Sequence, residues 1–181
     1  QDFCLLTKRQ KEKVVPEYLQ KLNEAYARLP AGERIIRLPT SVYGLQAPGG
    51  RLLETFLTEH PEVEELHLAG NMLNEAIGST RVKDPAGFDA LLRGLAKTRE
   101  AGKLRVLDLS QGIYTPEQLA YLAQQVLINH PSLKTLTLNA AFLTDAHLDA
   151  LKPGLQCPQL RTLNLRYNAL KGEAVILNAL V

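Results

Sequence analysis

The chain has 181 residues, of which 45% are hydrophobic and 22% are charged, a composition that is ordinary for a globular protein of one domain. Its formal net charge of +2 provides no basic field of the kind that nucleic-acid-binding domains carry, so nucleic acid is not an expected partner. No apolar run approaches the roughly 18 residues of a transmembrane helix, and no membrane partner is expected.

The two cysteines, Cys4 and Cys157, lie far apart and lack the CxxC spacing of a metal site. Two such cysteines do not make a disulfide framework, so an intracellular, cytoplasmic location fits best. The first residue is Gln rather than Met, and no signal peptide is visible. We therefore expect a processed or trimmed piece of a protein, from which a targeting segment could have been removed.

Residues 1–32 are expected to form an N-terminal helical cap. Val14, Tyr18, Leu22 and Ala25 share one helical face, which Leu29 continues. Such a helix would cover the first open end of the elements that follow.

From residue 33 onward the chain is internally repetitive. Four segments match the pattern LxxLxLxxNxL at its apolar positions: 63–73, 104–114, 133–143 and 160–170. A degenerate copy precedes them, with Ile36, Leu38, Ser41 and Tyr43 in the equivalent places. The LxL core predicts a short strand with its leucines on one side. Because a lone repeat cannot bury these leucines, at least about three stacked copies are needed.

The segments between the strands are predicted to be helical. Thr115 has the features of an N-cap, with Pro116 at the first helical position and Gln118 at the third. Apolar residues then recur at helical spacing. Helix starts are expected at three residue pairs: Asp84-Pro85, Thr115-Pro116 and Thr144-Asp145.

With these features the chain resembles a leucine-rich-repeat protein over residues 33–181. Most equivalent strand residues recur at intervals of 27 to 30 residues, similar to the long repeats of the ribonuclease-inhibitor subclass. The pair Cys157-Pro158 before a strand is also similar to that subclass. The interval from Leu66 to Leu107 is 41 residues, so an insertion is expected within 74–87.

The resemblance implies an α/β fold, a right-handed solenoid of about five repeats. Its parallel sheet would line the concave face, and its helices the convex face. Residues 172–181 are expected to begin a further convex-side helix. Because an uncovered apolar end is a liability, more repeats beyond residue 181, or end-to-end packing, are expected.

Strand side chains alternate between faces, so the residues between the strand leucines should point to the concave face. One residue per strand forms a predicted central column: Arg37, His67, Asp108, Thr137 and Asn164. The expected partner-binding site adds Glu65, Ser110, Asn139, Arg166 and Tyr167. The remaining expected concave and loop positions are Ile35, Pro39, Ala69, Val106, Thr135, Thr162, Gln111, Tyr114 and Phe142. Tyr167 is either an interface anchor or packs over a neighbouring loop.

The asparagine position of the pattern is irregular in this chain. It holds Ser41, Asn71, Gly112, Ala141 and Asn168. The resemblance implies that this residue bonds backbone groups between repeats. Asn71 and Asn168 are expected to do so, whereas Gly112 and Ala141 cannot do so with a side chain.

His67, Asp108 and Ser110 superficially suggest a catalytic triad. Ser110, however, lies two residues after Asp108, roughly 6–7 Å away by strand rise, and an exposed sheet face offers no enclosing pocket. No GxSxG motif is present, and no His pair has metal-ligand spacing. His60 and His130 each precede Pro just before a strand, which indicates a structural role. No catalytic residue, metal or cofactor is therefore expected.

The pattern favours a non-catalytic protein–protein interaction module that binds another protein in its concave face, with the 74–87 insertion as an added contact loop. The loose repeats and the lack of Trp favour a secreted bacterial effector that acts on host proteins in the host cytosol, over a host regulatory or inhibitor protein. Two alternatives stay open. One is a substrate-targeting arm of a larger enzyme, for example of the ubiquitin pathway. The other is a scaffold that self-associates weakly end to end instead of remaining a monomer.

Overall fold

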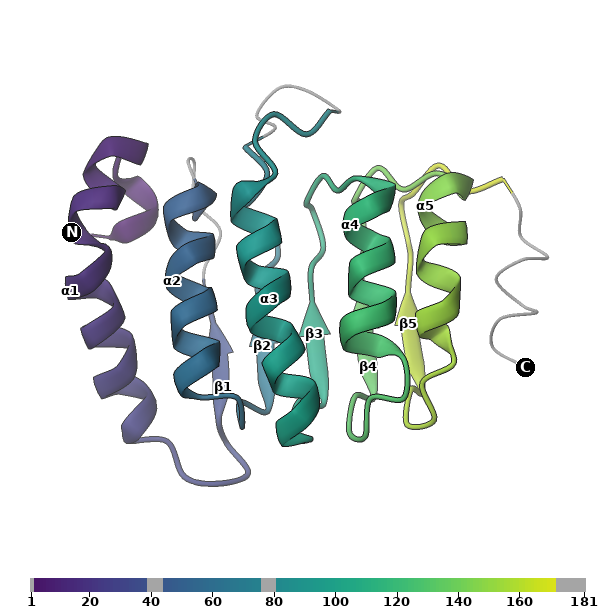
Figure 1. Ribbon diagram of the computed structural model, residues 1–181. Coiled ribbons are helices and arrows are strands. Elements are labelled where there is room, and N and C mark those ends of the chain that lie inside the picture. The colour runs from purple at the N-terminus through teal and green to yellow at the C-terminus, as the bar shows by residue number, and fades with distance from the viewer. Residues whose placement is uncertain (1, 39–43, 76–80, 172–181) are drawn as a thin grey trace.

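The computed structural model describes residues 2–38, 44–75 and 81–171, which form one parallel sheet with helices on one side (Figure 1). Its strands are β1 (Ile35–Arg37), β2 (Glu65–His67), β3 (Val106–Asp108), β4 (Thr135–Thr137) and β5 (Thr162–Asn164). Their order in the sheet is their order in the chain. The predicted α/β class with a parallel sheet is therefore confirmed.

The strand register follows the repeat. Ile36 pairs with Leu66, Leu66 with Leu107, Leu107 with Leu136, and Leu136 with Leu163. Each strand is three residues long, and the leucine that follows it still bonds the neighbouring strand: the Leu68 N–H donates to the Asp108 carbonyl at 2.9 Å, and the Leu109 N–H to the Thr137 carbonyl at 2.9 Å. The repeat unit thus contributes one strand, one connection and one helical segment at a time.

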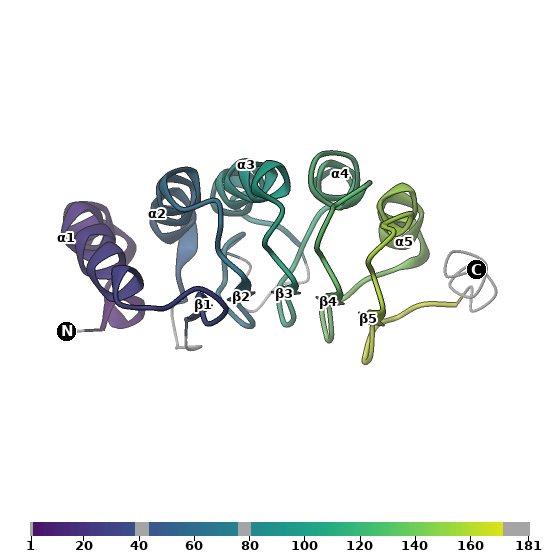
Figure 2. The same ribbon diagram turned by 90° about the horizontal axis from the view of Figure 1, so that it is seen from below.

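The helices are η1 (Phe3–Leu5), α1 (Lys8–Ala27), α2 (Gln46–Glu59), α3 (Ala86–Ala101), α4 (Pro116–Tyr121) and α5 (Asp145–Leu151). A π-helical segment, η2 (Leu122–Leu127), continues α4, and a 3-10 segment, η3 (Lys152–Leu155), continues α5. Figure 2 shows α2 to α5 as one layer over the sheet, with α1 at the β1 end of that layer. No described helix covers the opposite face of the sheet.

The predicted helix starts are confirmed, each within two residues. Thr115 and Gln118 form a reciprocal capping box at the start of α4, and Thr144 and His147 form one at α5. At α3 the Asp84 Oδ1 accepts a hydrogen bond from the Ala86 N–H, 3.0 Å away. These contacts satisfy donors that the first helical turn leaves without an intrahelical partner.

Helix α2 is not predicted by the sequence, because its first turn carries Pro48, Gly49 and Gly50, which are poor helix formers. Tertiary packing explains these residues. A Cβ atom at Gly50 would lie 2.1 Å from the Gly87 carbonyl oxygen, so the start of α2 touches α3 backbone to backbone. Gly50 and Gly87 permit this close approach, which a side chain at Gly50 would block, so packing rather than helix propensity explains Gly50.

The core is a continuous layer between the sheet and the helices. The central strand leucines Leu66, Leu107 and Leu136 are fully buried, and so are Leu95 and Leu122 on the helices. In β5 the equivalent Leu163 is only half-buried. The burial of one leucine per strand against one helical stripe is the packing that the repeat pattern predicts.

Helix α1 packs on α2 at the β1 end of the layer. The Tyr26 and Phe56 rings meet edge to face at 5.2 Å, and Tyr26 is buried. Lys11 is buried as well, and its Nζ donates to the Leu6 carbonyl at 2.6 Å and to Gln46 Oε1 at 2.9 Å. The 1–32 segment thus lies where the predicted cap would lie.

Both ends of the predicted 74–87 insertion are anchored. The buried Asn74 side chain donates to the Ile113 carbonyl at 2.6 Å. Lys8 of α1 pairs with Glu75 at 2.9 Å and with Asp84 at 3.1 Å. Residues 76–80 of the predicted contact loop lie outside the described residues, as do Pro39, Ser41, Tyr43 and the helix expected within 172–181.

Candidate functional site: the open face of the sheet

The face of the sheet without helices is called the open face here. It is formed by two residues per strand: Ile35, Arg37, Glu65, His67, Val106, Asp108, Thr135, Thr137, Thr162 and Asn164. The register places one predicted set in a single row across the sheet: Arg37, His67, Asp108, Thr137 and Asn164. The open face is therefore a polar surface fixed on a backbone ladder, with most of its side chains partly exposed.

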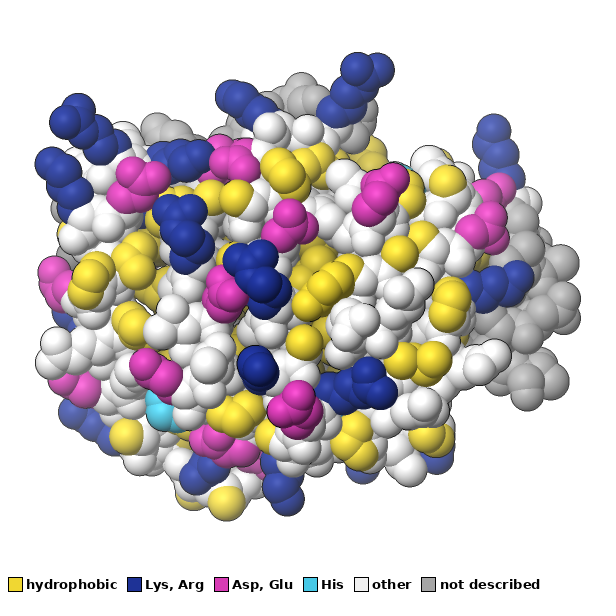
Figure 3. Space-filling model, in the orientation of Figure 1, with side chains coloured by type: hydrophobic (Ala, Val, Ile, Leu, Met, Phe, Trp, Pro, Cys, Tyr) yellow, Lys and Arg dark blue, Asp and Glu magenta, His cyan; other side chains and the backbone are white. Residues whose placement is uncertain are grey.

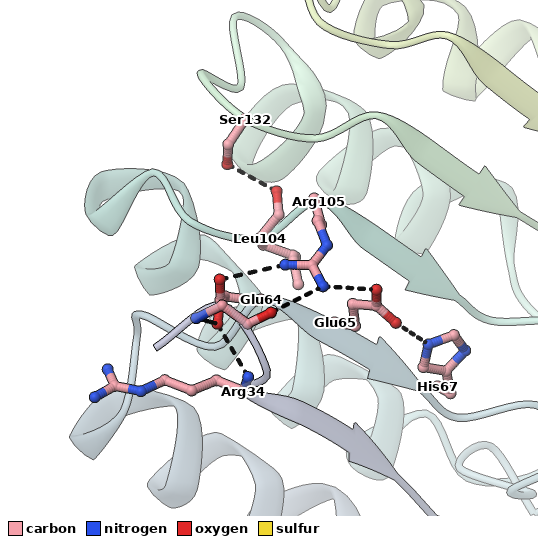
Figure 4. Close-up of polar contacts among 8 residues, drawn as sticks. Arg34, Glu64, Glu65, His67, Leu104, Arg105 and Ser132 are labelled. Carbon is pink, nitrogen blue, oxygen red and sulfur yellow. Dashed lines mark hydrogen bonds and ion pairs between the residues drawn. The ribbon is translucent and has the colours of Figure 1, made fainter. Parts of the chain in front are cut away.

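The β1–β3 part of the open face is a charge network centred on Glu65 (Figure 4). Glu65 Oε2 lies 2.8 Å from His67 Nε2 and 3.7 Å from the Arg37 guanidinium. Its other oxygen is 3.0 Å from Arg105, which also reaches Glu64 at 3.2 Å. In this part of the sheet, basic and acidic groups satisfy one another.

The protonation state of Glu65 reflects two opposing effects. Burial alone would raise the pKa of this carboxyl group. The hydrogen bond from His67 and the charge of Arg105 outweigh burial, so the pKa of Glu65 lies below its ordinary value. Glu65 is thus ionised at neutral pH and binds its two neighbours rather than an external ligand.

Two predicted site residues are structural instead. Ser110 is 7% exposed, and its Oγ accepts the Asn139 N–H at 3.0 Å. Asn139 Oδ1 in turn accepts the Arg166 N–H at 3.0 Å. The prediction that Ser110 is an exposed binding residue is wrong, because its side chain is buried and its hydroxyl group joins neighbouring repeats.

The asparagine position behaves as predicted where asparagine is present. Asn168 Nδ2 donates to the Leu138 carbonyl of the preceding repeat and to the Leu165 carbonyl of its own, both at 2.9 Å. Its Oδ1 accepts the Ala141 N–H at 3.0 Å. Asn71 Nδ2 donates similarly to the Leu38 carbonyl at 3.3 Å.

At Gly112 a different residue performs this role. Tyr114 is buried, and its hydroxyl donates to the Leu109 carbonyl, the group equivalent to the Leu165 carbonyl. A Cβ atom at Gly112 would lie 2.1 Å from that hydroxyl oxygen. The tyrosine therefore occupies the space of the missing asparagine, and the prediction that Tyr114 extends the binding surface is wrong.

Tyr167 is the most exposed large hydrophobic residue among the described ones, at 85%, and Phe142 follows at 57%. Both have positive φ, 61° and 51°. The repeat position of Tyr167 is held by Gly70, Gln111 and Ala140 in the other turns that the structure describes, all with positive φ. A left-handed backbone favours glycine and disfavours a tyrosine. Of the two interpretations of Tyr167, the structure supports an exposed side chain.

The side chains of His67, Asp108 and Ser110, which superficially suggest a triad, do not hydrogen-bond one another. The His67 ring contacts Glu65, Asp108 Oδ1 accepts the Ser110 N–H at 3.0 Å, and the Ser110 hydroxyl contacts Asn139. In the parts of the chain that the structure describes, no group of three or more His, Cys, Asp or Glu is placed to hold a metal ion. Within the same residues, no helix is both long and apolar enough to cross a membrane.

The helix side of the molecule offers a weaker candidate site. Hydrophobic, acidic and basic side chains are interspersed over it (Figure 3). A groove of about 510 Å³ lies between α3 and α4, lined by Leu92, Arg93, Gln118 and Tyr121 among others. Arg93 is paired with Glu54 at 2.7 Å, and Gln118 is bonded to Asn74 at 2.8 Å, so these polar groups are already used within the fold.

The sequence matches no protein-family model and no curated protein.

Proposed function

We propose that this chain is a leucine-rich-repeat solenoid of the ribonuclease-inhibitor type that binds a partner protein through the open face, without catalysis. The repeat pattern and the parallel sheet in chain order support the solenoid. A sheet whose side chains are held by a backbone ladder is preorganised, so little conformational entropy is lost when a partner binds.

The observation that carries the proposal is Tyr167. Its side chain is almost fully exposed and lies at a backbone position where Gly70 serves in an equivalent turn. A tyrosine there costs about 1 kcal/mol in backbone strain and buries only a small part of its side chain in return. Exposed tyrosines are frequent anchors of protein interfaces, so binding accounts for a residue that folding does not require.

Site-specific photocrosslinking tests this proposal. Benzoylphenylalanine replaces Tyr167 or Phe142 beside the open face, and Tyr121 or Leu5 elsewhere on the surface as controls. Phe142 and Leu5 are a matched pair, since they are 57% and 52% exposed. Adducts in an extract of the source cells are expected at Tyr167 and Phe142 and not at the controls. Equal or stronger adducts at Tyr121 or Leu5 would contradict binding through the open face.

A further inference from the structure

A column of charged residues runs along one edge of the open face, one position before each strand. Its members are Arg34, Glu64, Arg105, Lys134 and Arg161. Each backbone N–H in this column donates to the carbonyl of the preceding member at 2.8 or 2.9 Å. The residues are therefore adjacent rungs, roughly 5 Å apart by strand spacing.

The cations of this column differ in their neighbours on the preceding strand. Arg105 forms ion pairs with the carboxylates of Glu64 and Glu65, at 3.2 and 3.0 Å. The equivalent neighbours of Lys134 are Arg105 and Val106, which offer no negative charge.

Arg161 meets no negative charge either, because its equivalent neighbours are Lys134 and Thr135. Lys134 and Arg161 are exposed, and neither forms an ion pair with any described residue. Like charges directly opposite each other on neighbouring strands are destabilising. This edge of the sheet therefore carries positive charge that the described fold does not neutralise.

The opposite edge of the same strands is also cationic. Arg166 follows β5, is exposed, and lies five residues after Arg161, roughly 16 Å away by strand rise. Tyr167 stands next to it. Between the two edges the open face carries only neutral hydrogen-bonding side chains on β4 and β5: Thr135, Thr137, Thr162 and Asn164.

We propose that the β4–β5 part of the open face binds an acidic, extended protein segment, with Lys134 and Arg161 at one edge and Arg166 at the other binding its carboxylates. This inference rests on the proposed function and names the chemistry of the partner. The ring of Tyr167 covers the segment at the edge of the sheet. The charge network around Glu65 bounds the site on the side of β1–β3, because its cations are already paired.

A protein segment fits this surface better than a single-stranded nucleic acid. A single-stranded nucleic acid binds best in a groove that is basic along its whole length. On this surface its phosphates would lie near the carboxylate of Asp108 on the adjacent β3. Threonine and asparagine side chains with both donors and acceptors suit the amides and carboxylates of a peptide.

Selection from a peptide library tests the inference. Phage-displayed random peptides of about 12 residues, enough to cross three strands at roughly 4.8 Å each, are selected against the immobilised chain. The selected sequences are expected to be rich in Asp and Glu. A synthetic peptide of a selected sequence is then titrated by fluorescence anisotropy.

The titration compares two triple variants of equal charge change. The site variant is Lys134→Gln with Arg161→Gln and Arg166→Gln. The control variant is Lys13→Gln with Lys97→Gln and Lys152→Gln, three exposed lysines on α1, α3 and η3. The site variant is expected to bind about tenfold or more weakly, with affinity falling as salt rises, while the control variant stays close to the wild type. Circular dichroism of both variants verifies that each is folded.

The possible outcomes separate this inference from the proposed function. If the selected peptides crosslink at position 167 but are neutral or basic, the inference of an acidic partner is overturned, whereas binding through the open face is still supported. Selection of no peptide, or of peptides that crosslink only at Tyr121 or Leu5, overturns both. Equal weakening in the two triple variants, or tighter binding of an oligothymidine that responds to the site variant, also overturns the acidic protein segment.

Discussion

At the residue scale, a tyrosine two residues away replaces the asparagine of the repeat in the turn after β3. Gly112 has no side chain, and the Tyr114 hydroxyl takes the Leu109 carbonyl that an asparagine would take. The Tyr114 ring also packs on Phe88 of α3, with centroids 4.4 Å apart. The two residues therefore act as one unit, in which neither can change alone.

The first prediction concerns this pair. Gly112→Asn is expected to destabilise the protein by about 2 kcal/mol, because its side chain would overlap the tyrosine hydroxyl. The double variant Gly112→Asn with Tyr114→Leu restores the arrangement seen at Asn168 and is expected to recover at least half of that loss. Urea denaturation of the wild type, the two single variants Gly112→Asn and Tyr114→Leu, and the double variant measures it. Strictly additive losses would show that the two positions are independent.

His130 provides a second prediction at this scale. It is fully buried, and its Nδ1 accepts the backbone N–H groups of Ser132 and Leu133 at 3.2 and 3.1 Å. Burial, with a smaller contribution from the charge of Arg99, lowers the pKa of His130 from 6.5 to about 4. The unfolded chain therefore binds this proton more readily than the folded chain does.

Because of this difference, the stability that His130 provides is complete above pH 6.5. It is lost as the pH falls towards 4, by up to about 3 kcal/mol. His130→Asn keeps an acceptor but does not titrate. Denaturation from pH 7.5 to 4 is expected to show a smaller acid loss for this variant than for the wild type. Identical pH profiles would rule out His130 as the group responsible.

Tyr167 gives the third prediction, which separates folding from binding. Tyr167→Gly is expected to raise the free energy of unfolding by about 0.5–1 kcal/mol, because glycine accepts φ of 61° without strain. Ala140→Gly is the matched control at the equivalent position, where φ is 49°. Both variants should gain stability, and only Tyr167→Gly should lose the partner. A loss of stability in Tyr167→Gly would mean that its ring packs within the fold.

At the element scale, the strands differ in charge rather than in geometry. All five have the same three-residue length and the same register. The cation before β3 is neutralised by Glu64 and Glu65, whereas the cations before β4 and β5 are not. An array of equivalent strands thus presents two chemically distinct halves.

The fourth prediction follows from this difference between strands. Lys134→Glu places a carboxylate between Arg105 and Arg161, and is expected to raise the free energy of unfolding by about 0.5–1 kcal/mol at low salt. The gain should shrink as salt screens the charges. Thermal unfolding at low and high salt measures it. Lys97→Glu on the outer surface of α3 is the control, and an equal gain there would refute a local effect.

At the scale of the whole molecule, neighbouring elements stack and each strand pairs only with the strands beside it. Stability in such an array is roughly a sum over repeats and their interfaces, so opening can start at one end. The central leucine of β5 is half-buried, while its counterparts in β2, β3 and β4 are fully buried. Fewer buried contacts lower the cost of opening β5.

The fifth prediction is therefore a gradient of protection along the sheet. Amide hydrogens of β5 are expected to exchange at least about tenfold faster than those of β3, since each 1.4 kcal/mol of local stability corresponds to a factor of ten. Hydrogen exchange followed by mass spectrometry of peptides covering 104–110 and 160–166 measures this ratio. Equal protection of the two strands would indicate that the sheet opens as one unit.

The sequence by itself determined the elements that depend on local pattern. The period of the leucines placed all five strands in register, and the cap residues placed the starts of α4 and α5. Both signals are local: a strand leucine repeats at a fixed interval, and a cap acts over three residues. The leucine period also predicted the central row of the open face, because successive side chains of a strand point to opposite faces of the sheet.

Only the tertiary structure decided which polar residues remain available for a partner. Ser110 and Tyr114 resemble surface residues in the sequence, yet their hydroxyl groups bond the backbone of other residues. Helix α2 exists despite its glycines because α3 packs directly on its backbone. The Ser110–Asn139 bond and the approach of Gly50 to Gly87 join residues distant in the chain, and the fold of the turn brings the Tyr114 hydroxyl to the Leu109 carbonyl, so a local pattern contains none of these contacts. Tyr167 is 85% exposed, which only the packing of the described residues decides.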